Sequence, residues 1–390
     1  MAAVPGDHAV LMATLAQAPS RTDPAAPGTP HPPASVRHLG PNWYAAVMGT
    51  AIVANAGAAL PLTAPGPRLV YQVVWALSAL MLLTLLGART VHWVRHGDQA
   101  RRHLLDPAVA PFYGCLAMAL LAVGGGTLAV GRDVIGVPAA VAVDAVLWTV
   151  GTLAGLVGAA AIPYLMVTRH RIEPGSASPV WLLPLVAPMV SAAVGPALVA
   201  HLPAGQGQRA LLFGCYALFG MSLLATLLVL PLVLSRLIHH GPLPLALTPT
   251  LFLVLGPLGQ STTAVNNLAD AAPGVVDPST AHAMGAFAVL YGVPVMGFAL
   301  LWLALATAMV VRAVRRGMGF SMTWWGFTFP LGTCVTGAAG LARHTGLGAF
   351  DWLAAALFAA LVAAVAAAGA RTANGLARGQ LPAAPPPVTP

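Results

Sequence analysis

Ten long apolar stretches run through this chain, and they limit its fold more than any other feature. They cover approximately residues 42–62, 68–93, 111–130, 137–168, 180–201, 209–238, 244–268, 282–311, 322–342 and 349–369. The hydrocarbon core of a bilayer is about 30 Å thick, and an α-helix of roughly 20 apolar residues crosses it. Only 7% of all residues are charged. The sequence therefore predicts an all-α, polytopic membrane protein with ten transmembrane helices.

The arginines predict how these helices are oriented. Lys and Arg together number 18, and every one of them is Arg. Fourteen lie in the tails or next to the gaps after the second, fourth, sixth and eighth stretches, and only Arg68, Arg132, Arg209 and Arg343 lie on the other side. Because cationic loops stay cytoplasmic, we expect both termini inside, in a multi-pass protein of the plasma (cell) membrane. The net charge of +8 then reflects topology and predicts no nucleic-acid partner.

The two ends of the chain differ from the apolar region between them. Residues 1–40 are rich in Pro, Ala, Ser and Thr and lack a helical period, and the chain ends in the Pro-rich run 382–390. Such composition is typical of disordered segments. We expect disordered cytoplasmic tails at 1–40 and 371–390, flanking a ten-helix transmembrane domain at 41–370.

The odd-numbered stretches carry helix breakers near their centres. Those that we expect to line a pore or to kink a helix are Gly49, Gly125, Pro188, Gly256, Pro257, Pro330 and Gly332. Freed backbone groups are tolerated at membrane depth where they face protein or a water-filled path. Several even-numbered stretches are longer, so the pattern favours odd helices inside and even helices outside. Close packing of small residues is an alternative reason for many of these glycines.

The ninth stretch places an aromatic residue at the bilayer midplane. Phe329 lies midway between Arg316 and Arg343, about 20 Å from either at the rise of an α-helix. Pro330 follows it and removes a backbone hydrogen bond, which predicts a bend. The sequence alone leaves open whether Phe329 has a special role or is an ordinary buried aromatic residue.

Four motifs in chain order resemble one known family. They are PNWYAAVMGT at 41–50, WLLPLVAPMVS at 181–191, PTLFLVLGPLGQS at 249–261 and WWGFTFP at 324–330. The chain resembles the tellurite-resistance/dicarboxylate transporter family. This superfamily includes tellurite-resistance channels, plant slow-type anion channels, malic acid transporters and sulfite efflux pumps. The motifs span most of the apolar region.

The resemblance implies a fold and a gate. It implies ten helices as five helical hairpins around a central pore, odd helices inside and even helices outside, in a homotrimer of separate pores. It also implies that Phe329 plugs the pore. Family members include both channels and carriers, so channel and proton-coupled carrier remain alternatives. In the first helix, the position that matches a pore-facing glycine of the family is Ala46. This match weakens the expectation that Gly49 lines the pore.

The residues themselves favour weak binding of a small anion. The odd stretches hold no Arg at mid-depth, and the clearest acidic residue within the spans is Asp144. Backbone dipoles, hydroxyls and amides would then contact the substrate, which favours throughput over affinity. We expect an outer vestibule formed by Gln260, Ser261 and Asn266, with Arg209 and Arg343 attracting anions or anchoring the helix ends. Malate-like dicarboxylate, sulfite, chloride and nitrate are the candidate substrates, with no cofactor.

The competing class is a membrane-embedded, metal-dependent enzyme. It would use the cytoplasmic-side histidines His92, His96, His103, His239 and His240. Four arginines crowd the first three, which disfavours a cation there, and the sequence contains no phosphate-binding loop. We therefore expect no enzyme activity, no metal and no nucleotide partner.

Overall fold

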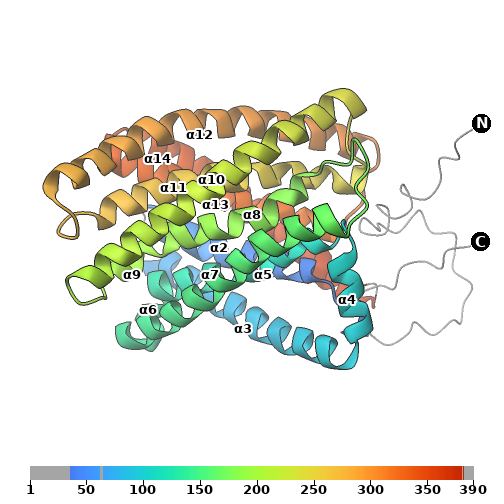
Figure 1. The fold of residues 1–390 in the computed structure, drawn as a ribbon, viewed down its shortest axis with the longest axis horizontal. Helices are drawn as coiled ribbons and strands as arrows, with labels where there is room; N and C mark the ends of the chain where they lie inside the picture. The colour runs from blue at the N-terminus through green and yellow to red at the C-terminus, as the bar shows by residue number, and fades with distance from the viewer. Residues whose placement is uncertain (1–35, 62–64, 380, 382–390) are drawn as a thin grey trace, which may run out of the picture.

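Seven helical segments of the structure are long and apolar enough to cross a membrane. The computed structural model describes residues 36–61, 65–379 and 381, and these fold into helices (Figure 1). The seven segments are Gly66–Arg95, Ala110–Ile135, Val137–Thr168, Pro179–Val199, Gln206–His240, Pro278–Arg315 and Gly348–Ala377. They match the second to sixth, eighth and tenth predicted stretches. The protein is a polytopic, all-helical membrane protein.

The other three predicted stretches are helical but shorter or interrupted. The first holds α2 (Tyr44–Ala59), and the seventh begins as a 3-10 helix, η6 (Leu245–Val254), and continues as α11 (Leu255–Ala271). The ninth likewise begins as η7 (Met322–Phe327) and continues as α13 (Thr328–Thr345).

The prolines explain where these α-helices start. Pro257 and Pro330 are the third residues of α11 and α13. The first-turn amides of an α-helix need no partner within the helix, so a proline costs little there. Pro330 stands in the first turn of an α-helix that follows a 3-10 segment, and the bend expected there stays a prediction. Pro188, by contrast, lies inside α8 (Leu182–Val194).

The remaining elements complete the chain. They are η1 (Val36–His38), η2 (Pro41–Trp43), α3 (Pro65–Arg95), α4 (Gly97–Leu105), η3 (Ala110–Tyr113), α5 (Gly114–Gly126), the π-helical η4 (Thr127–Gly131), α6 (Arg132–Ile135), α7 (Val137–Thr168), η5 (Pro179–Trp181), α9 (Pro196–Val199), α10 (Gln206–His240), α12 (Pro278–Arg315) and α14 (Gly348–Ala377).

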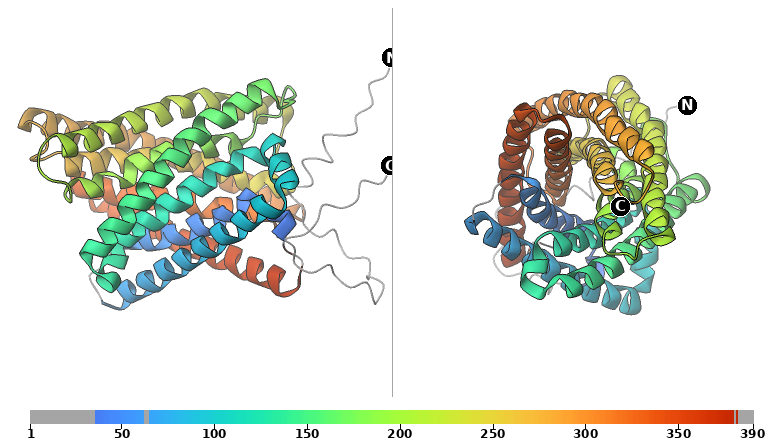
Figure 2. Two further views of the ribbon diagram at one scale, coloured as in Figure 1. Left: turned by 60° about the horizontal axis from the view of Figure 1, so that its bottom comes forward. Right: turned by 90° about the vertical axis from the view of Figure 1, so that its left-hand side faces the viewer.

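Helices that follow each other in the chain pack in pairs. The pairs are α2 with α3, α5 with α7, α8 with α10, α11 with α12, and α13 with α14. The first members of the pairs also pack in sequence around a centre, and α13 returns to α2 (Figure 2, right). Their residues are mostly buried, whereas the second members expose many apolar side chains, such as Leu83, Leu228 and Leu290. Apolar side chains on an outer surface are typical of contact with lipid.

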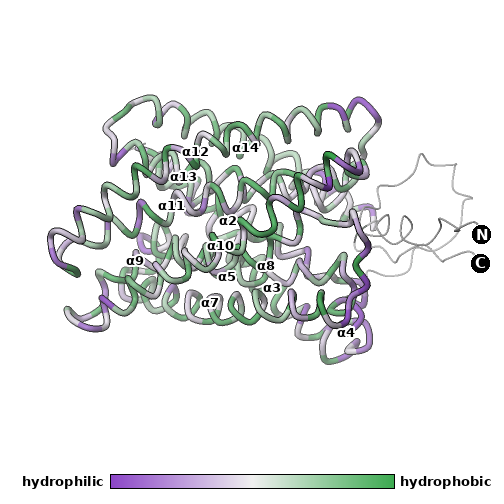
Figure 3. The backbone as a smooth tube through the Cα atoms, turned by 45° about the horizontal axis from the view of Figure 1, so that its top comes forward, coloured by the Kyte–Doolittle hydropathy of each residue, from purple (hydrophilic) through white to green (hydrophobic). Residues whose placement is uncertain are grey.

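Polar residues gather at the two ends of the helix bundle (Figure 3). At the end that holds α4, His170 Nε2 lies 3.2 Å from the backbone oxygen of Leu104 and so ties the loop after α7 to α4. At the opposite end, Arg68 pairs with Asp133 at 2.5 Å and Arg343 pairs with Asp270 at 2.9 Å. The four arginines of the smaller predicted group stand near helix ends on this second side.

The helical region extends beyond the predicted domain boundaries. Helix α14 continues to Ala377, so residues 371–377 are helical and are not part of a disordered tail. Residues 36–38 form η1, and Arg37 pairs with Asp98 of α4 at 2.9 Å. Most of the predicted tails, 1–35 and 382–390, lies outside the described residues.

Candidate functional site

A small apolar cavity lies at the centre of the bundle, and all five inner segments contribute to it. Its volume is about 10 Å³, and it is lined by Met48, Met118, Leu182, Leu183, Val186, Leu253, Gly256, Phe329 and Pro330. A cavity needs about 10–15 Å³ to hold one water molecule. The centre of the bundle is therefore closed to anything larger than a single water molecule.

Phe329 lines this centre and is buried in it. It is the second residue of α13 and only 2% exposed. Phe327, two residues earlier, does not line the cavity: its ring packs edge-on against Phe252, with centroids 4.9 Å apart, and against Trp324 at 5.9 Å. Trp325 Nε1 donates a hydrogen bond to Thr372 Oγ1 at 3.0 Å and fixes η7 to α14. The two phenylalanines of the motif thus have different surroundings.

The glycines of the inner helices have two distinct roles. A β-carbon on Gly256 would meet no atom within 4 Å, so the bare backbone of α11 faces the cavity. On Gly49 it would meet Thr328 and Trp325, and on Gly332 it would meet Ile52. Gly49 and Gly332 therefore allow α2 and α13 to approach closely, and neither lines the cavity. Gly125 of α5 is partly exposed and faces Val194, 3.2 Å from its ideal β-carbon position.

One face of α11 leads from the cavity towards the end of the bundle opposite α4. Gly256, Gln260, Thr263 and Asn267 follow each other at spacings of three or four residues and so share this face. Gly256 lines the central cavity, and Asn267 lines a second pocket of about 520 Å³ that α9, α10, α11 and the loop after α11 form. The amide of Asn267 donates to the backbone oxygen of Ala193 at 2.7 Å.

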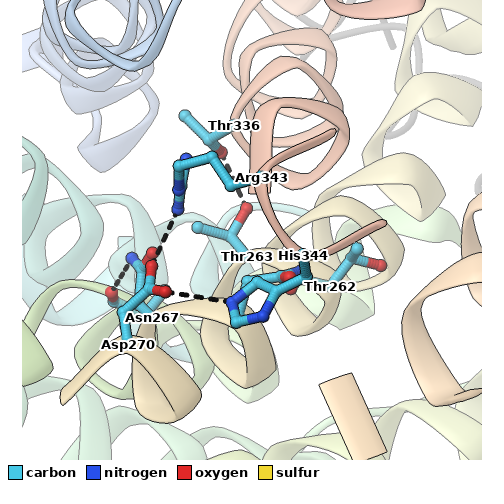
Figure 4. Close-up of polar contacts among 9 residues, drawn as sticks. Thr262, Thr263, Asn267, Asp270, Thr336, Arg343 and His344 are labelled. Atoms are coloured by element: carbon cyan, nitrogen blue, oxygen red, sulfur yellow. Dashed lines mark hydrogen bonds and ion pairs between the residues drawn. The ribbon is translucent and has the colours of Figure 1, made fainter. Parts of the chain in front are cut away.

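The faces of the inner helices that line the cavity carry polar residues seven positions further along the chain. Asn55 stands seven residues after Met48, Thr263 seven after Gly256, and Thr336 seven after Phe329. The hydroxyl oxygens of Thr263 and Thr336 lie 2.7 Å apart (Figure 4). Sequence reasoning missed Asn55 and Thr336. A seven-residue step from Phe329, close to two helical turns, leads to Thr336, whereas Asn55 follows only once Met48 is known to line the cavity.

The structure does not bring all predicted vestibule residues together. Ser261 and Asn266 are fully buried on other faces of α11. Ser261 Oγ donates to the oxygen of Leu258 at 3.0 Å, and Asn266 Nδ2 donates to the oxygen of Thr262 at 2.8 Å. Only Gln260 of the three lies on the face that connects cavity and pocket.

The two outer arginines have protein partners. Arg209 Nε donates to the oxygen of Val275 at 3.1 Å. Arg343 pairs with the Asp270 carboxylate, whose second oxygen lies 3.0 Å from His344 Nε2 (Figure 4). Asp270 offsets the charge of Arg343, an arrangement that suits the anchoring alternative better than the attraction of anions. Because both partners are about half exposed, the pair contributes about 0–1 kcal/mol to stability.

The residues of the competing enzyme hypothesis do not form a metal site in the described part of the chain. His92 and His103 stack with ring centroids 5.4 Å apart. Burial, helped by the nearby positive charge of Arg89, lowers the pKa of His103 to about 4. The residues that the structure describes contain no group of three or more His, Cys, Asp or Glu side chains placed to hold a metal ion.

Comparison with known proteins identifies the family. The sequence profile of the voltage-dependent anion channel family matches residues 38–373. An uncharacterized transporter of Methanocaldococcus jannaschii is 26% identical over 301 residues, which cover 77% of this chain and 82% of the relative. The sulfite efflux pump SSU1 of Trichophyton rubrum is 26% identical over 328 residues, which cover 82% of this chain and 86% of the pump. A second such pump, from Arthroderma otae, matches at 26% over 328 residues with the same coverage. The resemblance inferred from the four motifs is confirmed, and the chain belongs to the voltage-dependent anion channel family, whose members are channels and transporters and not enzymes.

Proposed function

We propose that the protein passes small anions across the plasma membrane along the centre of its five inner helices, and that Phe329 closes this path. One observation carries the proposal: a single cavity lined by all five inner segments, with Phe329 buried in it. An aromatic ring at a narrow apolar point closes a path by steric block and by dewetting, and needs no bound ion to do so.

The polar groups along the path suit a weakly bound anion. The cavity lining is apolar, and the face of α11 beyond it offers an amide, a hydroxyl and a second amide at Gln260, Thr263 and Asn267. No charged side chain lines the cavity, so an ion passing through it meets dipoles and is not held by a countercharge. Malate-like dicarboxylate, sulfite, chloride and nitrate are the candidate substrates, and the matched pumps named for sulfite favour sulfite.

Flux into proteoliposomes tests this function. Vesicles that contain the purified protein should take up labelled sulfite, malate or chloride, and protein-free vesicles should not. Uptake with and without a pH gradient separates a channel, whose flux follows the anion gradient alone, from a proton-coupled carrier. Transport of Na⁺ or K⁺ in vesicles that pass no anion would contradict the proposal.

We further propose that the five packed pairs are transmembrane hairpins, which gives ten spans with both termini cytoplasmic. The packing of the pairs and the unequal distribution of arginine between the two ends support this arrangement. By resemblance to the family, the protein would assemble as a homotrimer, with the exposed apolar faces of the outer helices against lipid or a neighbouring copy.

Cysteine labelling tests the topology. Single cysteines in place of Arg101 and Arg315 should both react with an impermeant reagent from the cytoplasmic side only. A cysteine at Arg132 should react from the opposite side, in a variant whose native cysteines, all buried, have been replaced. Labelling of positions 101 and 315 from different sides would rule out the even number of spans between them.

A further inference from the structure

The geometry points to Gln260 as the group that contacts the permeating ion and selects its chemical class. We propose that its side-chain amide binds a monoanion that keeps one acidic O–H, such as hydrogensulfite or a singly protonated dicarboxylate. The inference rests on the proposed function, since it concerns the same path.

Gln260 lies between the two cavities of the bundle. It shares its face of α11 with Gly256, one turn nearer the centre, and with Asn267, two turns towards the outer pocket. Gly256 lines the closed centre and Asn267 lines the larger pocket, so an ion on a path along this face of α11 would pass Gln260. Phe329 and Gly256 both line the closed centre, and Gln260 stands one turn beyond Gly256 on α11.

The amide of Gln260 lacks a protein partner although it is buried. Gln260 is only 3% exposed, its Oε1 accepts no hydrogen bond, and its Nε2 donates none to any residue that the structure describes. Exchanging the oxygen and nitrogen positions would not change this, because both ends are unpaired. A buried polar group without a partner costs about 1–3 kcal/mol. A ligand that satisfies both ends would recover much of this cost.

The other amides near the path behave differently. Asn55 Nδ2 donates to the oxygen of Ala122 at 3.0 Å, and Asn267 Nδ2 donates to the oxygen of Ala193 at 2.7 Å. Asn266 Nδ2 donates to the oxygen of Thr262. In each of these three side chains Nδ2 is paired with a backbone oxygen, although Oδ1 of Asn55 and of Asn266 is unpaired, whereas neither end of the Gln260 amide has a partner among the residues that the structure describes.

The two unpaired ends of the amide define the class of ion. A primary amide presents one N–H donor and one oxygen acceptor on the same edge. An acid monoanion can accept from Nε2 through a charged oxygen and donate its O–H to Oε1, so both ends are satisfied at once. Chloride and nitrate accept from Nε2 but leave Oε1 unpaired, and a fully deprotonated dianion does the same. Sites that hydrogen-bond a hydroxyl reject analogues that lack it.

Replacing the amide by a side chain of similar length and volume tests the assignment. In Gln260→Met, uptake of sulfite at acidic pH, where hydrogensulfite dominates, should fall at least about tenfold relative to chloride uptake. Thr262→Val is the matched control: Thr262 neighbours Gln260 on a buried face and donates only to Leu258 within its own helix, so the flux ratio should stay at the wild-type value. An unchanged ratio in Gln260→Met would overturn the assignment.

A competition experiment on the wild-type protein gives a second test that needs no variant. Sulfite should inhibit chloride uptake more strongly as the pH falls and hydrogensulfite replaces the dianion, whereas inhibition by nitrate should not depend on pH. Equal inhibition by sulfite at all pH values would overturn the assignment even if Gln260→Met failed to fold. Absence of any anion flux in the wild type would instead refute the proposed function.

Discussion

Replacing Phe329 with alanine should raise anion flux through the protein by at least about tenfold. The ring lines a centre with room for little more than a water molecule, and the remaining lining from α2, α5, α8 and η6 is apolar. Loss of the ring should therefore leave a continuous path beside Gly256, where no β-carbon narrows the space. Initial rates of labelled chloride or sulfite uptake into proteoliposomes, at equal amounts of folded protein, measure the effect.

Phe327→Ala is the matched control for this prediction. Phe327 lies in the same motif but packs against Phe252 and Trp324 and does not line the cavity, so its loss should leave flux near the wild-type value. Truncating a tightly packed Phe costs about 3–5 kcal/mol in soluble cores. Phe329→Ala should cost less than this, because the ring of Phe329 borders a cavity. Higher flux in Phe327→Ala with unchanged flux in Phe329→Ala would show that the gate is assigned to the wrong residue.

The sequence alone could single out Phe329, because that prediction needs only residues that lie close to it in the chain. Its distance in residues from Arg316 and Arg343, the proline that follows it and the motif around it all belong to one short part of the chain. The membrane character was predictable for the same reason, since length and hydropathy belong to single segments. The 3-10 segments before α11 and α13 were missed because proline was interpreted as a bend, whereas both prolines stand in the first turn of their helices.

The vestibule prediction was less accurate because it treated a run of polar residues as one surface. Successive residues of a helix point about 100° apart, so Gln260 and Asn267 share a face whereas Ser261 and Asn266 point into the protein. Applying the helical period would have separated them. The sequence could not predict which residue pairs with Arg343. Its partner, Asp270, lies 73 residues away, and only the packing of α11 against α13 brings the two together.

Replacing Gly259 with alanine should destabilise the fold strongly, whereas the same change at Gly256, one turn earlier in the same helix, should not. The chains of α11 and α13 approach so closely at Gly259 that a β-carbon would lie 2.5 Å from the backbone nitrogen of Cys334 and 2.6 Å from the carbonyl carbon of Thr333. Backbone atoms cannot move aside as a flexible side chain can, so the two helices must separate. Overpacking of this kind costs about 1–3 kcal/mol or more, which exceeds the roughly 0.5–1 kcal/mol that alanine gains over glycine within a helix.

At Gly256 alanine should bring only the gain in helix stability, because a β-carbon there meets nothing within 4 Å. Thermal unfolding of the purified protein in detergent should therefore show a clearly lower midpoint for Gly259→Ala and an unchanged or slightly higher midpoint for Gly256→Ala. The added methyl group of Gly256→Ala narrows the cavity that Phe329 also lines, so this variant should fold normally and yet pass anions more slowly. Equal midpoints for the two variants would mean that α11 and α13 are not held at this distance. A Gly256→Ala variant with wild-type flux would show that the permeating ion does not pass along this face of α11.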